Sequence, residues 1–415
     1  MMKKNSDEKT IFDRIRNTNL LGLLLFMWTF FSATYVTYRM LLSDGITFRA
    51  DYVDHLRMAL ENEGYSLMNI VFRVFHNSQN YNIYIALFMG MLVAFAGQAI
   101  VFVFNTVINI ESIDDILFKE KIHDIIYILS YSFIFISAIN IPQKSPFYML
   151  SDSEGHYVVA GDTIVSSFMT QPWHNCTYIA MRLFGLLSVG LFARIVFRNE
   201  KTNVNYICLF ITFLLANAFK PNFILAFAPT AFLICLIEFI KNRKIDFKRH
   251  LIIAVAIVIS LFPLLYQYKA MYNVDSDSGL EITGRVISGL INSGYFKWEF
   301  ICTYVYPILV TGVAIAKKKF NSAFAMAWIF DFITLLQRLL LLETGHRMMH
   351  ANWIWNKPCS ALVLFIICTA ILIECSLDKD KLDNLKRIAW GILVIHLFNG
   401  FMYFGVIYMG LGYAH

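Results

Sequence analysis

The chain has 415 residues, of which 58% are hydrophobic and only 15% are charged. Soluble domains contain about 45–50% apolar and about 25% charged residues, so this composition excludes an ordinary soluble protein. The formal net charge of +6 arises from lysine and arginine in short segments between apolar runs, a distribution typical of membrane-protein loops rather than of nucleic-acid binding. Many of these runs approach the roughly 20 residues that span a bilayer core, which predicts an all-α polytopic membrane protein.

The predicted elements begin with a basic, polar cytoplasmic leader at residues 1–18, followed by an apolar run of full spanning length. Residues 19–415 are predicted to form a single transmembrane domain with no separate soluble domain. The shortest predicted span is 204–218, and a tilted or re-entrant half-hairpin is the alternative there because Pro221 ends it. The eleven predicted spans are 19–42, 83–108, 123–141, 174–197, 204–218, 222–240, 251–268, 299–316, 321–342, 359–375 and 388–411.

Charge predicts the orientation of these spans. With the N-terminus inside, most of the 35 lysines and arginines fall in inside segments, as the positive-inside rule requires. The outer loop 43–82 is then long enough for two interfacial helices, over 51–63 and 65–75, which combine charges with apolar residues. All clusters of polar residues that are candidates for catalysis or binding fall on this same outer side. Their common side predicts one site there.

The first cluster contains Asp51, Asp54 and His55. Asp51 and His55 are four residues apart and therefore lie on one face of a helix. A carboxylate steadied by a histidine is a candidate general base, or a ligand for a divalent cation such as Mg²⁺ or Mn²⁺. The alternative is that these charges only solvate an interfacial helix.

Two further clusters lie at the ends of predicted spans. Trp173, His174 and Asn175 open the span at 174–197, where they are candidates for substrate binding, for an interfacial belt or for helix capping. Lys220 precedes Pro221 at a break between two apolar stretches. A lysine beside a helix N-terminus suits a phosphate, and snorkelling to the interface is the alternative.

The last cluster, over residues 343–352, is the densest group of protonatable and phosphate-binding side chains in the sequence. Arginine binds phosphate in a bidentate way, and histidine exchanges protons near neutral pH, so phosphate or substrate binding is predicted here. An internally paired interfacial loop is the alternative. The following Trp353 and Trp355 are candidates for stacking on sugar rings or for anchoring the interface. The cluster consists of Glu343, His346, Arg347, His350 and Asn352.

One predicted span carries opposite charges. Asp331 and Arg338 are seven residues apart and thus on the same helical face. They are expected to form a structural pair or to line a cavity, since charges inside the membrane are costly.

As an ordered set, these motifs resemble the C-type (GT-C) superfamily of integral membrane glycosyltransferases, within it the bacterial surface-polysaccharide proteins. The likeness rests on the acidic motif in the first outer loop and on the motifs that follow in order. It covers the whole length, although each motif is short. The motifs are Asp51 with His55, Pro172-Trp173-His174-Asn175, Lys220-Pro221, Glu343-x-Gly345-x-Arg347 and His350-x-Asn352.

The resemblance implies a polyprenyl-phosphate-linked sugar donor, a glycan or lipid acceptor, and transfer on the extracytoplasmic face of the bacterial cytoplasmic membrane. Asp51 is the implied catalytic base, with inversion at the sugar. The phosphate is expected to meet Lys220, Arg347, His350 and His346. Membrane lipids are expected partners and nucleic acid is not. Alternatives are a lipid-linked oligosaccharide polymerase or ligase, a transporter or flippase of lipid-linked sugars, and a membrane acyltransferase.

Overall fold

The computed structural model is predominantly α-helical in the part of the chain that it describes, which confirms the prediction of a polytopic all-α membrane protein. Eight helical segments of that part are long and apolar enough to cross a membrane. The described residues are 20–42, 51–61, 66–108, 116–137, 149–151, 157–159, 173–242, 246–272, 279–284, 287, 296–344, 352–377 and 382–410. The predicted leader at 1–18 lies outside them.

The eight segments agree with predicted spans to within a few residues at most boundaries. The span predicted at 251–268 is two helices, which meet at Leu261. The segments are α2 (Leu20–Leu42), α5 (Tyr81–Val107), α7 (Cys176–Val196), α9 (Asn222–Asn242), α10 (Phe247–Ser260) with α11 (Phe262–Tyr272), α14 (Ser322–Leu340), α15 (Asn356–Ser376) and α16 (Asp383–Met409).

Three other predicted spans correspond to helices that lie outside this set of eight: α6 (Ile116–Phe133), α8 (Asn203–Phe219) and α13 (Phe296–Ala316). The boundaries predicted for the first, 123–141, are displaced toward the C-terminus. The helix ends at Phe133 because the chain then turns inward. There the Phe135 ring packs against Trp173 and Phe404, with centroids 5.6 and 4.6 Å away.

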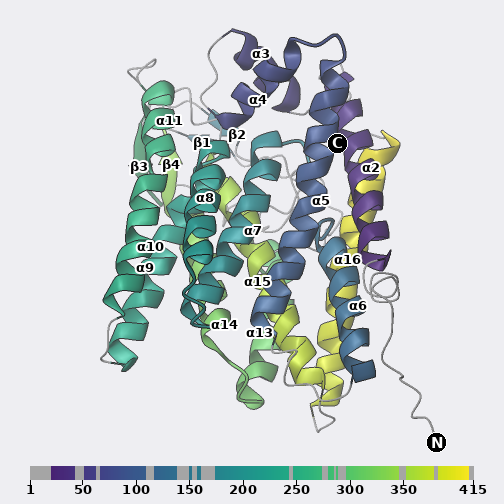
Figure 1. Ribbon diagram of the computed structural model, residues 1–415, viewed down its shortest axis with the longest axis vertical. Coiled ribbons are helices and arrows are strands. Elements are labelled where there is room, and N and C mark those ends of the chain that lie inside the picture. The colour runs from purple at the N-terminus through teal and green to yellow at the C-terminus, as the bar shows by residue number, and fades with distance from the viewer. Residues whose placement is uncertain are drawn as a thin grey trace, which may run out of the picture.

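The long helices run side by side, and two short helices, α3 (Asp51–Leu60) and α4 (Leu67–His76), lie across one end of the bundle (Figure 1). These two helices confirm the helical prediction for 51–63 and 65–75. Polar side chains join them, since Asn69 donates from Nδ2 to the His55 carbonyl at 2.9 Å and Arg73 donates from Nε to the Ala59 carbonyl at 2.9 Å. The second bond satisfies a carbonyl in the last turn of α3, and the first ties the middle of α3 to α4.

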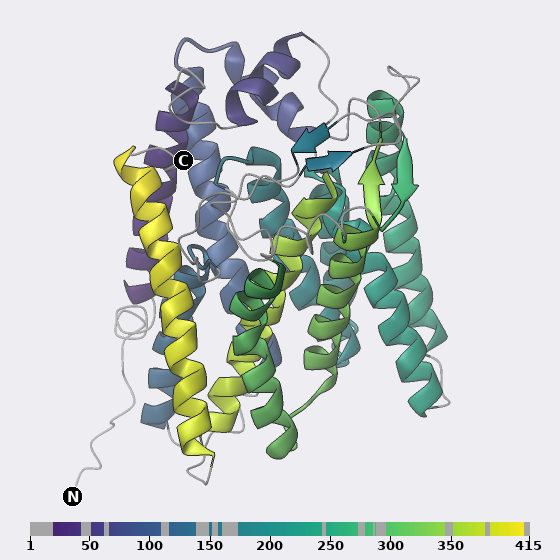
Figure 2. The same cartoon turned by 180° about the vertical axis from the view of Figure 1, so that it is seen from behind.

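Two small antiparallel strand pairs lie toward the same end (Figure 2). The strand β1 (Met149–Ser151) pairs with β2 (Tyr157–Val159), and β3 (Leu280–Ile282) pairs with β4 (Leu341–Glu343). A 3-10 helix, η3 (Asn352–Trp355), precedes α15. The sequence did not predict the strands, because three residues are too few to show an alternating pattern.

The helices α7 and α15 form the centre of the bundle and are buried over most of their length. The outer helices α2, α10 and α16 instead expose large apolar side chains, such as Phe31, Val258 and Phe398. A helix that is apolar on its exposed face needs an apolar solvent, so these helices are the ones that lipid surrounds.

A buried ion pair joins α14 to α15. Lys357 pairs with Asp331, and both side chains are almost completely buried. Asp331 also accepts from the Tyr304 hydroxyl at 2.7 Å and from Ser360 Oγ at 3.0 Å. The structure thus pairs Asp331 with Lys357, where the sequence suggested Arg338. Lys357 was assigned to an outer loop because the span was predicted to begin only at Cys359.

Candidate active site

Asp51 opens α3 and is held in place by the start of α7. Its backbone N–H donates to the His174 carbonyl at 3.0 Å, and its carboxylate Oδ2 accepts from Asn175 Nδ2 at 2.8 Å. These two bonds connect segments that are 124 residues apart in sequence. The predicted catalytic acid therefore has a fixed backbone and one fixed carboxylate oxygen.

The other two residues of the first cluster differ from each other in burial. His55 is buried beside Asp51, and among the described residues its Nδ1 has no hydrogen-bond partner. Burial lowers the pKa of the His55 imidazole, and the Asp51 carboxylate opposes this shift. Asp54 is exposed and pairs with Arg57 at 3.2 Å. His55 is thus predominantly neutral near pH 7. Asp54, in contrast, lies at the solvent-exposed edge of the cluster.

The three residues of the second cluster have different structural roles. Trp173 packs in the core, His174 links it to the next helix, and Asn175 caps that helix. Trp173 is buried against Phe135 and Phe404, and the Arg182 guanidinium lies over its ring at 5.8 Å. The His174 ring lies edge-on to Trp355 with centroids 5.3 Å apart. Asn175 caps α7, because its Oδ1 accepts from the Tyr178 N–H at 2.8 Å. Asn175 reaches Asp51 as well, while Trp173 and His174 are not part of the cavity lining.

Lys220 lies at the break between α8 and α9. Its backbone is extended, at φ −157° and ψ 122°, as expected for a residue that precedes proline. Gln267 of α11 supports the break, because its Nε2 donates to the carbonyls of Asn217 and Ala218 at 3.1 and 3.0 Å. The last carbonyls of α8 are thereby satisfied, and the lysine side chain is directed into the protein.

The Lys220 ammonium is buried with few partners. Only 9% of the residue is exposed. Among the described residues its hydrogen-bond acceptor is Thr177 Oγ1 at 3.3 Å, and its Nζ lies 5.6 Å from the centre of the Trp355 ring. Burial lowers the pKa of this ammonium to about 8, and the Asp51 carboxylate opposes the shift. A buried cation with donors to spare is suited to an anionic ligand.

The last cluster is only partly described. Glu343 is buried at the end of β4, where Leu280 of β3 is its partner residue in the antiparallel ladder. Asn352 begins η3, but its side chain lies outside the described part. His346, Arg347 and His350 also lie outside the described residues, so their predicted roles stay predictions.

Several of the predicted site residues line one cavity of about 790 Å³, at the end of the bundle that α3 and α4 cover (Figure 1). Residues from four of the predicted outer segments line it, although these segments are far apart in sequence. One wall is apolar and comes mainly from α11, with Leu264, Leu265 and Tyr268. The predicted residues in the lining are Asp51, Asp54, His55, Asn175, Lys220 and Glu343, together with Trp353 and Trp355.

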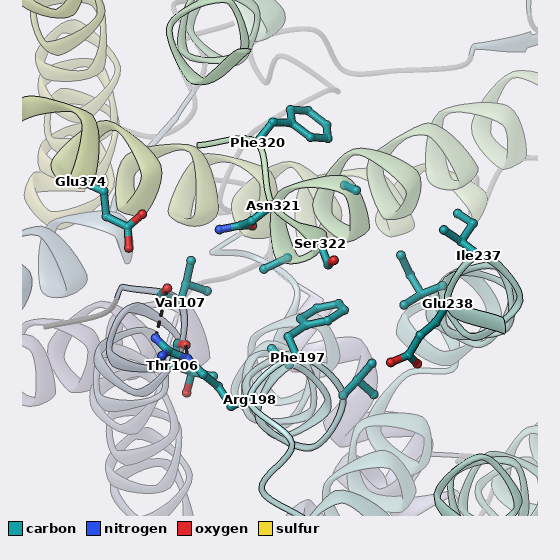
Figure 3. A pocket seen from close by; sticks show the side chains of 15 residues that line it. Thr106, Val107, Phe197, Arg198, Ile237, Glu238, Phe320, Asn321, Ser322 and Glu374 are labelled. Carbon is teal, nitrogen blue, oxygen red and sulfur yellow. Dashed lines mark hydrogen bonds between the residues drawn. The ribbon is translucent and has the colours of Figure 1, made fainter. Parts of the chain in front are cut away.

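A second cavity, of about 640 Å³, is lined by residues at the opposite ends of the long helices. Figure 3 shows the side chains that line it. Its lining comes from the C-terminal ends of α5, α7, α9 and α15 and from the start of α14. The Arg198 guanidinium already donates to the carbonyls of Thr106 and Ile108, at 2.8 and 3.0 Å. Glu238 is paired with Arg249. Among the described residues, none of the predicted site residues lines this second cavity.

Three residues of the first cavity were missed by sequence reasoning. Thr177 lies just inside α7, Gln267 interrupts an otherwise apolar run, and Arg57 follows one turn after Asp54. Gln267 carried a usable signal, because an amide in an apolar span requires a partner. Thr177 carried none, since threonine near a helix start is commonplace.

Among the described residues, no group of three or more His, Cys, Asp or Glu side chains is placed to hold a metal ion. Asp51 and His55 together offer at most two side chains. The described residues therefore do not fit the predicted divalent cation as a fully liganded ion.

A comparison of the sequence with models of known protein families and with curated proteins finds no match to either.

Proposed function

We propose that this protein is a membrane glycosyltransferase that moves a sugar from a polyprenyl-phosphate donor to a glycan or lipid acceptor on the extracytoplasmic face. One observation carries the proposal: the buried ammonium of Lys220 and the carboxylate of Asp51 line the same cavity. The reaction itself comes from the resemblance to the C-type superfamily. The cavity supports it by combining an anion-binding group, an acidic group and an apolar wall.

Lys220 is the proposed contact for the donor phosphate. It directly precedes the first turn of α9, where free backbone N–H groups and the helix dipole favour an anion. In a buried site, the attraction between an ammonium and a phosphate is stronger than in water. The phosphate site is proposed to include Arg347, His346 and His350 as well.

The remaining lining suits the other two parts of a lipid-linked sugar. The apolar side chains Leu264 and Leu265 provide a surface for an isoprenoid chain, because both line the cavity and Leu265 is largely exposed. Trp353 and Trp355 offer flat faces for a sugar ring. The proposed polar contacts of the substrates are Glu343, Asn352 and Asn175. Trp173 and His174 are proposed to support these contacts from outside the cavity lining.

Asp51 is the proposed general base. It accepts the proton of the acceptor hydroxyl while that oxygen attacks the anomeric carbon of the donor sugar. The bond from this carbon to the phosphate oxygen breaks, and the polyprenyl phosphate leaves with the electron pair. Lys220 stabilises the charge that grows on the phosphate. Attack opposite to the leaving group inverts the anomeric centre, and a polymerase or ligase would use the same step with a longer glycan donor.

A transporter or flippase of lipid-linked sugars is the second candidate, because a cavity is present at each end of the bundle. Side chains such as Phe192, Phe227 and Phe330 fill the core with no exposed surface or almost none. A transporter would have to open a polar path through this aromatic packing, whereas a transferase acts at one end only.

The deciding experiment compares Asp51→Asn with Glu61→Gln in the native cells. Both changes convert an acid to its amide in the same outer segment, but the exposed Glu61 does not line the cavity. At equal protein levels, Asp51→Asn is expected to reduce the product glycan at least a hundredfold and to leave its lipid-linked donor to accumulate, as measured by mass spectrometry. Unchanged glycan in Asp51→Asn would refute Asp51 as the general base of the transferase, and donor accumulation only on the inner leaflet would favour the transporter.

A further inference from the structure

The hydroxyl of Thr177 lies between the two charged groups of the candidate active site. Thr177 is 3% exposed and lies near the start of α7. Its Oγ1 accepts from Lys220 Nζ at 3.3 Å and donates to Asn175 Oδ1 at 2.9 Å. Asn175 in turn donates from Nδ2 to Asp51 Oδ2 at 2.8 Å. A continuous chain of hydrogen bonds thus runs from the ammonium to the carboxylate.

The donors and acceptors of the four side chains fix the direction of this chain of hydrogen bonds, from Lys220 toward Asp51, while Lys220 is charged. A charged ammonium has only donors, so the Thr177 oxygen must accept from Lys220 and its single proton is then directed to Asn175. The Asn175 carbonyl oxygen also accepts from the Tyr178 backbone N–H, at 2.8 Å. The amide of Asn175 therefore turns its NH₂ group toward Asp51.

A neutral Lys220 removes this restriction. Its amine keeps N–H donors but gains a lone pair that can accept from the Thr177 hydroxyl, and in that second orientation the hydroxyl no longer points to Asn175. The amide of Asn175 loses one of the two bonds that hold its oxygen, and the bond to Asp51 is less firmly fixed. The charge state of Lys220 is therefore communicated to Asp51 through the orientation of one hydroxyl group.

We propose that Thr177 is a positioning residue that couples the charge on Lys220 to the orientation of the Asp51 carboxylate. The catalytic consequence rests on the proposed function. A donor phosphate beside Lys220 keeps the ammonium charged, and the chain then holds Asp51 ready for the acceptor hydroxyl. Near or above pH 8, where free Lys220 loses its proton, donor binding would thereby prepare the general base, although the donor does not touch it.

A purely structural role for Thr177 makes a different prediction. The hydroxyl would then only strengthen the Asn175 cap at the start of α7, and its loss would lower stability without changing the titration of Lys220. In the coupling proposal, Thr177 is the acceptor that favours the charged ammonium, so its removal must make Lys220 easier to deprotonate. The titration of Lys220 separates the two roles.

The experiment measures the reactivity of Lys220 toward acetic anhydride as a function of pH, in the intact protein in detergent, with peptide mass spectrometry. The wild-type midpoint is expected at about 8. Thr177→Val keeps the shape of the side chain but removes the acceptor, and it should lower the midpoint by about one pH unit. Thr177→Ser should restore the wild-type midpoint, and Thr177→Ala replaces the valine variant if that one does not fold.

Thr230→Val is the matched control, because among the described residues the buried Thr230 hydroxyl bonds within its own helix, to the Ala226 carbonyl at 2.8 Å. Its Lys220 midpoint should equal that of the wild type. Equal midpoints in Thr177→Val and wild type, or a serine variant that behaves like valine, would overturn the coupling. The measurement needs no sugar substrate, so such a result would leave the transferase proposal standing, which the Asp51→Asn experiment tests separately.

Discussion

The amide of Asn175 donates to the carboxylate of Asp51 at 2.8 Å, while its carbonyl oxygen caps α7. One side chain thus serves both the start of a central helix and the acid that opens α3. This double use explains why a polar residue is buried at the position. Mutation of Asn175 can therefore separate its capping of α7 from its contact with Asp51.

Asn175→Asp should keep the helix cap, because aspartate and asparagine are equally good N-caps. The new carboxylate cannot donate to Asp51 and places a like charge beside it, so the two carboxylates repel each other. The melting temperature is expected to change little, while the acidic limb of the pH–activity profile moves upward by about one unit. Asn175→Ala should lower the melting temperature in addition, and a wild-type pH profile in Asn175→Asp would contradict the contact.

Anion binding at Lys220 should weaken as the pH rises through about 8. Below that value the ammonium is charged and attracts the ligand, whereas above it the charge is lost. The phosphate stays ionised throughout, since its second pKa is about 6. The affinity for a polyprenyl phosphate, measured by tryptophan fluorescence in detergent, should be about tenfold lower at pH 9 than at pH 7.

Two variants control the anion-binding prediction. Lys220→Met should lower the affinity at pH 7 and remove its pH dependence. Lys269→Met removes an exposed charge from α11 outside the cavity lining and should leave both unchanged. An equal pH dependence in Lys220→Met would assign the titration to another group.

Lys357→Met should destabilise the protein by about 3–5 kcal/mol, because it leaves the Asp331 carboxylate buried without its cation. The double variant Asp331→Leu with Lys357→Met should recover much of this loss, since neither charge is then buried. Thermal unfolding in detergent provides the comparison. A double variant no more stable than the single one would mean that the Tyr304 and Ser360 contacts, rather than the ion pair, dominate.

Gly400 should not tolerate alanine. A Cβ atom there would overlap the backbone carbonyl oxygen of Phe135 and lie 2.8 Å from the Ser137 nitrogen, so the chain after α6 would have to move. A loss of about 1–3 kcal/mol is expected from such overpacking. Gly391 lies on the same helix with open space around its Cβ position, so Gly391→Ala should retain or slightly raise stability. Equal melting temperatures of the two variants would contradict this close approach.

The candidate site was only partly predictable from the sequence. Asp51, His55, Lys220 and Glu343 could be selected because each is a charged or titratable residue beside an apolar run, where burial is costly and requires a reason. Thr177 could not, because its hydroxyl matters only through Lys220, which is 43 residues away in the chain. The pairing of Asp331 with Lys357 could not be predicted for the same reason, because the two residues lie on different helices.

The sequence by itself determined that this is a polytopic helical membrane protein and where most of its helices lie. Those properties follow from apolar run length, proline and charge, which act within a short stretch of chain. Only the tertiary structure decided that Asp51 meets Asn175, that Lys220 is buried above Trp355 and that both line one cavity. Such contacts depend on how helices pack around one another, and side chains that are far apart in sequence leave no local pattern from which their meeting could be read.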